Sequence, residues 1–261
     1  MPYRYSNLKG VHNYLDKMFE KHSKQDWDSV VAICGGVGVG KSNLGLHMLE
    51  YWVKKLKGKV TEKDIKHMCM GTEDFLKDLS DCKAVEMTLY DEAGELSSRR
   101  AMSKLNNMIM VTYQIIRADN IFTVLILPDI WYIDSYFRNT RIKGLFYVHK
   151  RGKVSFWSSN KIKKIIGLNA NRQIKNYFVV SPSFTDSYPK YKGILAEEYA
   201  KMKQKKTSEA RKKILENIDN NGNELSIYKK EVAKRMMEKD LKQKDIGFFL
   251  NVHQTTVGKW F

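Results

Sequence analysis

The chain has 261 residues, of which 46 are lysine or arginine and 29 are aspartate or glutamate, so its formal net charge is +17. An apolar content of 43%, with 11% aromatic residues, excludes a wholly disordered chain, because such chains cannot bury enough apolar surface to offset the entropy of ordering. A charge this large exceeds what solubility requires and indicates an anionic partner, the alternative being a lysine-rich solvated surface.

Strand-like and helix-like segments alternate from residue 28 to residue 150. Short apolar runs predict strands at 29–34, 66–70, 85–90, 121–127 and 145–149. Helical periodicity predicts helices at 41–53, 72–79, 101–118 and 132–140. A terminal hairpin follows at 151–157. This alternation implies an α/β fold with a mainly parallel sheet that is covered on both faces.

The pattern changes after residue 160, where Pro182 and Pro189 interrupt any long element. A highly charged helix is predicted for 196–217, a linker for 219–223 and a last helical unit for 226–261. We therefore divide the chain into an N-terminal extension (1–27), an α/β core (28–160), a basic extension with linker (161–221) and a small all-α domain (222–261).

A glycine-rich segment between the first strand and the first core helix matches G-x-x-x-x-G-K-[ST], the pattern of a phosphate-binding loop. Glycines let backbone N–H groups approach phosphates without a Cβ clash, and the next helix presents its positive N-terminus. Lys41 would reach the β- and γ-phosphates, and the Ser42 hydroxyl would ligate Mg²⁺. The alternative is a glycine-rich turn without function. The predicted nucleotide-binding residues are Gly35, Gly36, Val37, Gly38, Val39, Gly40, Lys41, Ser42 and Asn43.

Two carboxylates, Asp91 and Glu92, follow the predicted strand 85–90. Asp91 is expected to hold Mg²⁺ with Ser42, and Glu92 to polarise the attacking water as general base. Such a pair favours ATP hydrolysis over a kinase or a GTP switch, and the sequence has no Asn/Thr-Lys-x-Asp guanine-reading motif. The expected cofactors are ATP and Mg²⁺; a solvated strand end is the alternative for the pair.

Several motifs resemble FtsK/HerA-like ATPases, which belong to the additional-strand, catalytic-glutamate class of P-loop ATPases and occur in archaeal viruses, plasmids and integrated elements. The motifs are Asp91-Glu92-Ala93-Gly94-Glu95-Leu96, Ser98-Arg99-Arg100, the predicted helix 106–117, the segment 136–141 and the segment 184–189. The resemblance covers roughly residues 28–200. It implies a three-layer P-loop NTPase fold and a homo-oligomer, such as a hexameric ring, that hydrolyses ATP between subunits. Relatives often carry a Gln or Asn sensor after the fourth strand, where this chain has Asp129.

The resemblance also implies an arginine that a neighbouring subunit supplies to stabilise the γ-phosphate charge. Arg138 and Arg141 are the best candidates, because they follow the fourth strand and lie three residues apart, on one helix face. Arg99, Arg100 and Arg117 are further candidates. A solvated or DNA-facing side chain is the alternative for each arginine.

The excess positive charge lies entirely after residue 134. Residues 1–134 carry 18 basic and 18 acidic side chains, whereas residues 135–189 carry 11 basic side chains and a single acid, Asp186. Residues 190–261 carry 17 basic and 10 acidic side chains. The acid-free stretch 135–185 is typical of a surface that contacts phosphate, so we expect duplex DNA as the partner. Phe156 and Trp157 lie among the cations of this stretch. A core position is favoured over a base-stacking role for both.

The end of the chain, residues 242–260, resembles a helix-turn-helix. Ile246, Leu250, Val252, Val257 and Trp260 would form its core, Gly247 would let the two helices approach, and Asn251 stands where the turn needs a left-handed residue. The second helix would begin near Gln254 and enter the major groove. An ordinary helical hairpin is the alternative. The predicted DNA-contacting residues are Gln254, Thr255, Thr256 and Lys259.

The three cysteines, Cys34, Cys69 and Cys82, are widely separated. Their spacing predicts neither a disulfide framework nor a zinc site. Residues 1–10 are polar and lack an apolar signal core. No apolar run approaches the roughly 20 residues needed to span a bilayer, so we expect a cytoplasmic protein without a membrane partner.

Together these features predict an ATP-hydrolysing, DNA-binding protein of a virus or mobile element. ATP hydrolysis would be coupled to DNA translocation, packaging, remodelling or replication. Two alternatives remain open at this point. One is a DnaA/IstB-like, ATP-dependent replication initiator or helicase loader, and the other is a DNA-binding transcription regulator with a weak ATPase.

Overall fold

The computed structural model describes residues 8–25, 27–91, 119–172, 174–238 and 241–261, except for the side chains of 213–227. The chain divides into two compact units, Met1–Gln204 and Lys205–Phe261. Some predictions fall outside the described residues. They concern Glu92, the motif 93–100 with its two arginines, and the helix 101–118 with Arg117.

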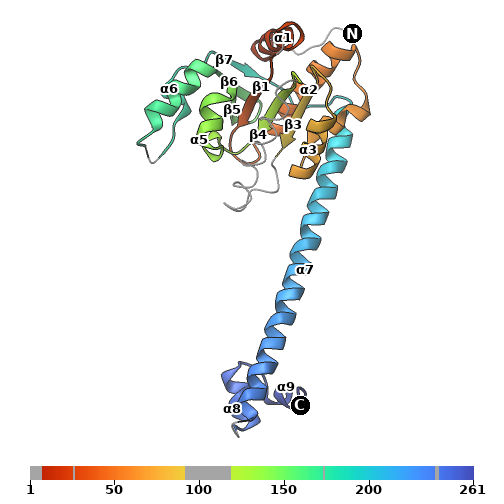
Figure 1. Ribbon diagram of the computed structural model, residues 1–261, viewed down its shortest axis with the longest axis vertical. Coiled ribbons are helices and arrows are strands. Elements are labelled where there is room, and N and C mark those ends of the chain that lie inside the picture. The colour runs from red at the N-terminus through yellow and green to blue at the C-terminus, as the bar shows by residue number, and fades with distance from the viewer. Residues whose placement is uncertain (1–7, 26, 92–118, 173, 239–240) are drawn as a thin grey trace. The chain divides into compact units, whose positions relative to one another are not determined.

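A seven-stranded sheet forms the centre of the first unit, in the order β2-β3-β4-β1-β5-β6-β7 (Figure 1). Strands β1 to β5 pair in parallel, whereas β6 and β7 are antiparallel additions next to β5. The predicted α/β class and the mainly parallel sheet are confirmed. The strands are β1 (Ser29–Cys34), β2 (Met68–Cys69), β3 (Met87–Asp91), β4 (Phe122–Ile126), β5 (Ile142–Lys150), β6 (Lys153–Ser158) and β7 (Phe184–Ser187).

Helices cover both faces of this sheet, because successive side chains of each strand point to opposite faces. Val31 and Ile33 of β1 pack with α1 and α2, whereas Val30 and Ala32 pack with α3, α5 and α6. The helices of the first unit are α1 (Lys9–Lys24), α2 (Lys41–Lys57), α3 (Thr72–Asp81), α5 (Ser135–Thr140), α6 (Ser159–Asn169) and the 3-10 helices η1 (Glu62–His67), η2 (Ile130–Tyr132) and η3 (Tyr177–Val179).

Strand β4 lies between β1 and β3 and pairs in parallel with both. The carboxyl ends of these strands therefore meet at one edge of the sheet. Residue 35, which follows β1, and Asp91, the last residue of β3, both lie at that edge. The strand order thus brings together two sequence motifs that are more than 50 residues apart along the chain.

The structure differs from the sequence prediction at two places. The helix predicted for 132–140 is divided into η2 and α5, because the Asp134 side chain accepts from the N–H groups of Tyr136 and Phe137 and starts a new helix there. The linker predicted for 219–223 instead continues α7 (Leu195–Met237). Asn and Gly cost a helix only about 0.5–1 kcal/mol each, which the surrounding Lys, Glu and Leu residues can offset.

The second unit contains the later part of α7 together with α8 (Gln243–Phe249) and α9 (Gln254–Gly258). Ala233, Ile246 and Val257 are fully buried and form its core. As predicted, Asn251 adopts a left-handed conformation (φ 52°). Gly247 also fulfils its predicted role, since an added Cβ would lie 2.9 Å from the Val252 carbonyl oxygen. Within the described residues, no helix combines the length and apolarity required to cross a bilayer.

Candidate functional site

A cavity of about 1320 Å³ opens at the carboxyl ends of β1 and β3. Most of its lining comes from the glycine loop (residues 35–40), the start of α2, the segment 188–193 after β7, and the first turns of α7. The ends of β3 and β4 and the turn between β5 and β6 complete it, with Asp91, Ile126, Pro128, Arg151 and Gly152. Six of the nine predicted nucleotide-binding residues line it: Val37, Gly38, Gly40, Lys41, Ser42 and Asn43. Gly35 and Gly36 instead point their carbonyl groups at Lys41, and Val39 packs against the core.

The glycine loop needs its glycines for conformation and for close packing. Gly38 and Gly40 have φ values of +75° and +101°, which side chains rarely adopt. An added Cβ at Gly35 would lie 2.4 Å from the backbone oxygen of Val148 in β5. The loop is therefore held tightly against the sheet at Gly35, while its tip is free to present backbone N–H groups to the cavity.

Lys41 is the first residue of α2, a helix of 17 residues. Its ammonium group donates hydrogen bonds to the carbonyl oxygens of Gly35 (2.7 Å) and Gly36 (2.8 Å). The Lys41 side chain therefore turns back toward the glycine loop that precedes it. The positive end of the helix and the Lys41 charge lie at the same wall of the cavity, which suits an anionic ligand.

Ser42 and Asp91 converge on a single hydroxyl group, that of Tyr199 in α7. The Tyr199 hydroxyl donates to Asp91 Oδ2 at 3.0 Å and also hydrogen-bonds with the Ser42 side chain. Burial, and then the negative charge of Asp91, raise the pKa of Tyr199, so the phenol remains a protonated donor. Two oxygen ligands that face one point are the kind of donor set that Mg²⁺ prefers.

The cavity walls carry more positive than negative charge. Cationic side chains come from five positions, and two carboxylates accompany them. The cations are Lys41, Arg151, Lys190, Lys192 and Lys203, and the carboxylates are Asp91 and Glu197. Arg151 also donates to the carbonyl oxygen of Gly38 at 3.3 Å, which places its guanidinium beside the tip of the glycine loop. The arrangement favours a polyanion such as a triphosphate.

Asn43, which lines the cavity, also holds one of its walls in place. Its amide donates to the Pro189 carbonyl oxygen at 2.9 Å, and its Oδ1 accepts from the Tyr191 N–H. The Tyr188 hydroxyl donates to the carbonyl oxygen of Gly40 at 3.1 Å. These bonds fasten the segment 188–193 to the start of α2, so that it forms one wall of the cavity.

Sequence reasoning did not assign Tyr188, Tyr191 or Tyr199 to the site. All three line the cavity, yet they follow the glycine loop by about 150 residues or more. The motif 184–189, which contains Tyr188, indicates a family resemblance but no role in the cavity. No local sequence pattern predicts that Tyr199 belongs to the site. Only the packing of α7 and of the segment 188–193 against α2 reveals them.

The two candidate arginine fingers are engaged within the chain. The Arg138 guanidinium stacks on the Trp131 ring at 4.6 Å and donates to the Ile133 carbonyl oxygen at 3.2 Å. Burial lowers the pKa of Arg138. Arg141 forms an ion pair with Asp28 at 3.5 Å. Both side chains lie outside the lining of the cavity.

The candidate sensor Asp129 is also held by local contacts. Its carboxylate accepts from the Trp131 N–H at 3.0 Å, which caps η2, and from the Tyr177 hydroxyl. The neighbouring Pro128 lines the cavity, whereas the Asp129 side chain is committed to η2 and η3. The structure therefore gives Asp129 an observed role in positioning the segment after β4.

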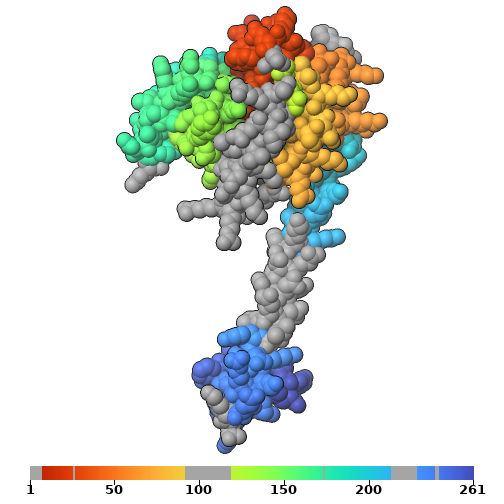
Figure 2. Space-filling model, viewed as in Figure 1, coloured from red at the N-terminus to blue at the C-terminus, as the bar shows by residue number. Residues whose placement is uncertain are grey.

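The acid-free stretch runs from α5 through β5, β6, α6 and η3 to the start of β7. Much of it appears in green at one end of the first unit in Figure 2. Phe156 and Trp157 are 4% and 0% exposed, which confirms the prediction that they are core residues. Some cations satisfy the backbone: Lys161 donates to the carbonyl oxygens of Ser181 and Pro182. Other cations are exposed to solvent: Lys150, Arg151, Lys153, Lys163, Lys164 and Arg172.

In the second unit, the predicted DNA-contacting residues lie on α9 or directly after it. Gln254, Thr255 and Lys259 are exposed, and Thr256 is half-buried. The Thr255 hydroxyl and N–H both contact Nδ1 of His253, the residue that caps α9. Thr255 therefore takes part in capping α9, whereas Gln254 and Lys259 are exposed polar residues near it.

Comparison with known proteins gives no assignment. No protein-family model matches the chain, and no curated protein is significantly similar to it in sequence.

Proposed function

We propose that the chain is an ATP-hydrolysing, DNA-binding protein whose cavity takes Mg²⁺-ATP. The observation that carries this proposal is the convergence of Ser42 and Asp91 on one point beside Lys41 and the glycine loop. The position of β4 between β1 and β3 supports an additional-strand ATPase, because that class is defined by a strand inserted there.

Each residue of the proposed site has a defined task. The Lys41 ammonium leaves the loop carbonyls and binds β- and γ-phosphate oxygens, while N–H groups of the glycine loop hold the remaining phosphate oxygens. Ser42 and Asp91 hold Mg²⁺, which neutralises charge on the phosphates when bound. Glu92 directly follows Asp91 in the sequence and accepts a proton from the attacking water.

Binding of DNA is supported by the exposed cations and by the second unit. The exposed cations of the acid-free stretch suit phosphate contacts, which give affinity that is independent of sequence and sensitive to salt. The second unit has a compact helical core, a tight turn at Asn251 and exposed polar groups on α9, as a helix-turn-helix would. It would provide the sequence preference.

The proposal includes a homo-oligomer, such as a hexameric ring, in which Arg138 or Arg141 reaches a neighbouring subunit's nucleotide. Each arginine would then exchange an intramolecular partner, Trp131 or Asp28, for the γ-phosphate. ATP hydrolysis would drive DNA translocation, packaging, remodelling or replication.

The test is the rate of ATP hydrolysis by the full chain, with and without duplex DNA, at several salt concentrations. We expect hydrolysis that DNA stimulates at low salt and less so at high salt. Glu92→Gln should bind ATP without turning it over; full turnover by this variant would contradict the assigned base. Site-specific DNA binding that is unaffected by Glu92→Gln, together with negligible hydrolysis by the unaltered chain, would favour a transcription regulator.

A further inference from the structure

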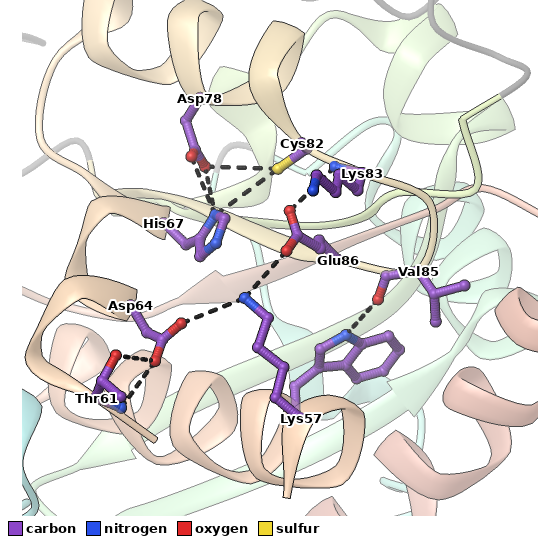
Figure 3. A network of polar contacts seen from close by, with 10 residues as sticks. Lys57, Thr61, Asp64, His67, Asp78, Cys82, Lys83, Val85 and Glu86 are labelled. Carbon is purple, nitrogen blue, oxygen red and sulfur yellow. Dashed lines mark hydrogen bonds and ion pairs between the residues drawn. The ribbon is translucent and has the colours of Figure 1, made fainter. Parts of the chain in front are cut away.

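A second cluster of reactive side chains lies away from the cavity, in the part of the first unit formed by η1, β2 and α3. His67 and Asp78 are 1% and 6% exposed, and Cys82 is half-buried (Figure 3). His67 Nδ1 lies 3.0 Å and 3.1 Å from the two carboxylate oxygens of Asp78. Cys82 Sγ lies 3.8 Å from His67 Nδ1 and 3.8 Å from Asp78 Oδ2.

The fold creates this cluster from residues that the sequence separates. His67 ends η1, while Asp78 and Cys82 are four residues apart and therefore lie on one face at the end of α3. The two segments meet because α3 packs against β2, the short strand that directly follows η1. The spacing of Cys and His along the chain matches no common zinc motif, which is why the sequence did not indicate a metal site.

The separations approach those of a metal centre. A tetrahedral zinc site with ligand distances of about 2.0–2.3 Å places its ligand atoms roughly 3.3–3.6 Å apart. The distances from His67 Nδ1 to the Asp78 oxygens (3.0 and 3.1 Å) are shorter, and the Cys82 Sγ distances (3.8 Å) longer, than a bound cation would set, so the cation would replace the His67–Asp78 hydrogen bond. The three side chains offer one nitrogen, one oxygen and one sulfur atom, all within 4.8 Å of one another. We propose that His67, Asp78 and Cys82 bind a divalent cation of the zinc class.

The atoms around the cluster show how its ligands are held. His67 Nε2 is buried and has no hydrogen-bond partner among the described residues, so Nδ1, which faces Asp78 and Cys82, is the nitrogen that would bind the cation. A second thiol, Cys69 in β2, also hydrogen-bonds with Asp78. Below them, the Lys57 ammonium holds Glu86 at 3.1 Å and Asp64 at 3.4 Å, as Figure 3 shows.

The chemistry of binding is proton exchange without redox change. The cation binds the thiolate form of Cys82, so the thiol proton passes to solvent as the S–metal bond forms. Cys82 is half-buried, so the cluster is close to the protein surface on this side.

The position of the cluster gives the cation a structural role. Strand β2 has two residues and lies at the edge of the sheet, where it pairs with β3. A cation held by His67 and by the end of α3 would fasten η1 and α3 together across this short strand. This role is independent of the nucleotide cavity, and the proposal holds whether or not ATP is bound there.

The test uses the full chain, stripped of metal and free of nucleotide, titrated with Co²⁺ as a spectroscopic substitute for Zn²⁺. We expect one equivalent of Co²⁺ with a thiolate-to-cobalt charge-transfer band, which oxygen ligands such as Ser42 and Asp91 cannot produce. Cys82→Ser should abolish the band, and His67→Gln should weaken binding at least tenfold. Cys34→Ala, which removes the one cysteine outside this region, should leave the band unchanged.

A second measurement covers the case in which a variant fails to fold. In the unaltered chain, added Zn²⁺ should protect Cys82 from alkylation, as located by peptide mass spectrometry, and should raise the melting temperature. The proposal is overturned if the unaltered chain shows no charge-transfer band and no protection of Cys82. It is equally overturned if a folded Cys82→Ser chain keeps the band, because the thiolate that binds the cation is then not Cys82.

Discussion

The two units of the chain differ in how their predicted functional residues are held. In the first unit, two large apolar clusters on opposite faces of the sheet fix the glycine loop, Asp91 and Tyr199 against one another. In the second unit, Ala233, Ile246 and Val257 are the buried apolar residues of the core. The proposed phosphate site therefore depends on long-range packing, whereas the proposed DNA reader depends on a few buried side chains.

The largest effect is expected from a charge placed in the core of the second unit. Ile246→Asp would bury an unpaired carboxylate at a fully buried position, at a cost of about 4 kcal/mol or more. Hydrogen exchange of the full chain should then show loss of protection in residues 241–261 and unchanged protection in the sheet. Phe248→Asp, at a position 90% exposed on the same helix, is the matched control and should retain protection. Loss of protection in the sheet as well would contradict the division into two units.

The next largest effect is a loss of stability when the contact between the glycine loop and the sheet is disturbed. Gly35→Ala forces a Cβ against the β5 backbone and should lower the free energy of unfolding by about 2–3 kcal/mol. Gly36→Ala is the matched control, because its nearest neighbour would be 3.7 Å away, an ordinary contact. Urea denaturation of both variants measures the difference. Equal stability would show that the loop adjusts freely.

A smaller effect is expected at Tyr199, whose hydroxyl occupies the oxygen atoms proposed for Mg²⁺. Tyr199→Phe removes one competing hydrogen-bond donor, so Mg²⁺-dependent ATP affinity should rise roughly threefold to tenfold. Tyr191→Phe is the control, since Tyr191 lines the cavity and its hydroxyl accepts from the Leu195 N–H. Calorimetric titration distinguishes the two. Weaker binding by Tyr199→Phe would mean that the hydroxyl contacts the ligand itself.

The smallest expected effect is a change in stability with pH, caused by a buried histidine in the core of the first unit. Burial lowers the pKa of His22. Its ring lies edge-on to the stacked rings of Trp52 and Phe122, and its Nδ1 donates to the Asn120 carbonyl oxygen at 2.7 Å. The unfolded chain therefore binds a proton more readily, so stability is complete above about pH 6.5 and declines as the pH falls below it. Urea midpoints between pH 7 and pH 5 should show this decline, and His22→Phe should make it shallower. An unchanged slope would assign the dependence to other groups.

The sequence predicted those parts of the fold that depend on local patterns. The apolar runs before Gly35 and before Asp91 identified β1 and β3, and the left-handed residue at Asn251 followed from turn chemistry. These features were predictable because a few adjacent residues determine them. The continuous α7 was missed because weak helix formers at 219–223 were read as a break, although the strong helix formers around them extend the helix.

The remainder of the candidate site depends on tertiary packing and was not predictable. The partners of Asn43, Arg138 and Arg141 lie in segments that the sequence did not connect with them. Tyr199 reaches Asp91 across 108 positions of the chain. Positive charge alone could not show which cations bind carbonyl oxygens within the fold and which remain exposed.

The central claim is that the glycine loop, Lys41, Ser42 and Asp91 form a site for Mg²⁺-ATP. Calorimetric titration of the full chain with ATP, with and without Mg²⁺, tests it most directly. The account predicts saturable ATP binding that is stronger with Mg²⁺ than without it. Lys41→Ala should reduce the affinity at least a hundredfold, and Asp91→Asn should remove the difference that Mg²⁺ makes. No binding by the unaltered chain, or equal binding by a folded Lys41→Ala variant, would contradict it.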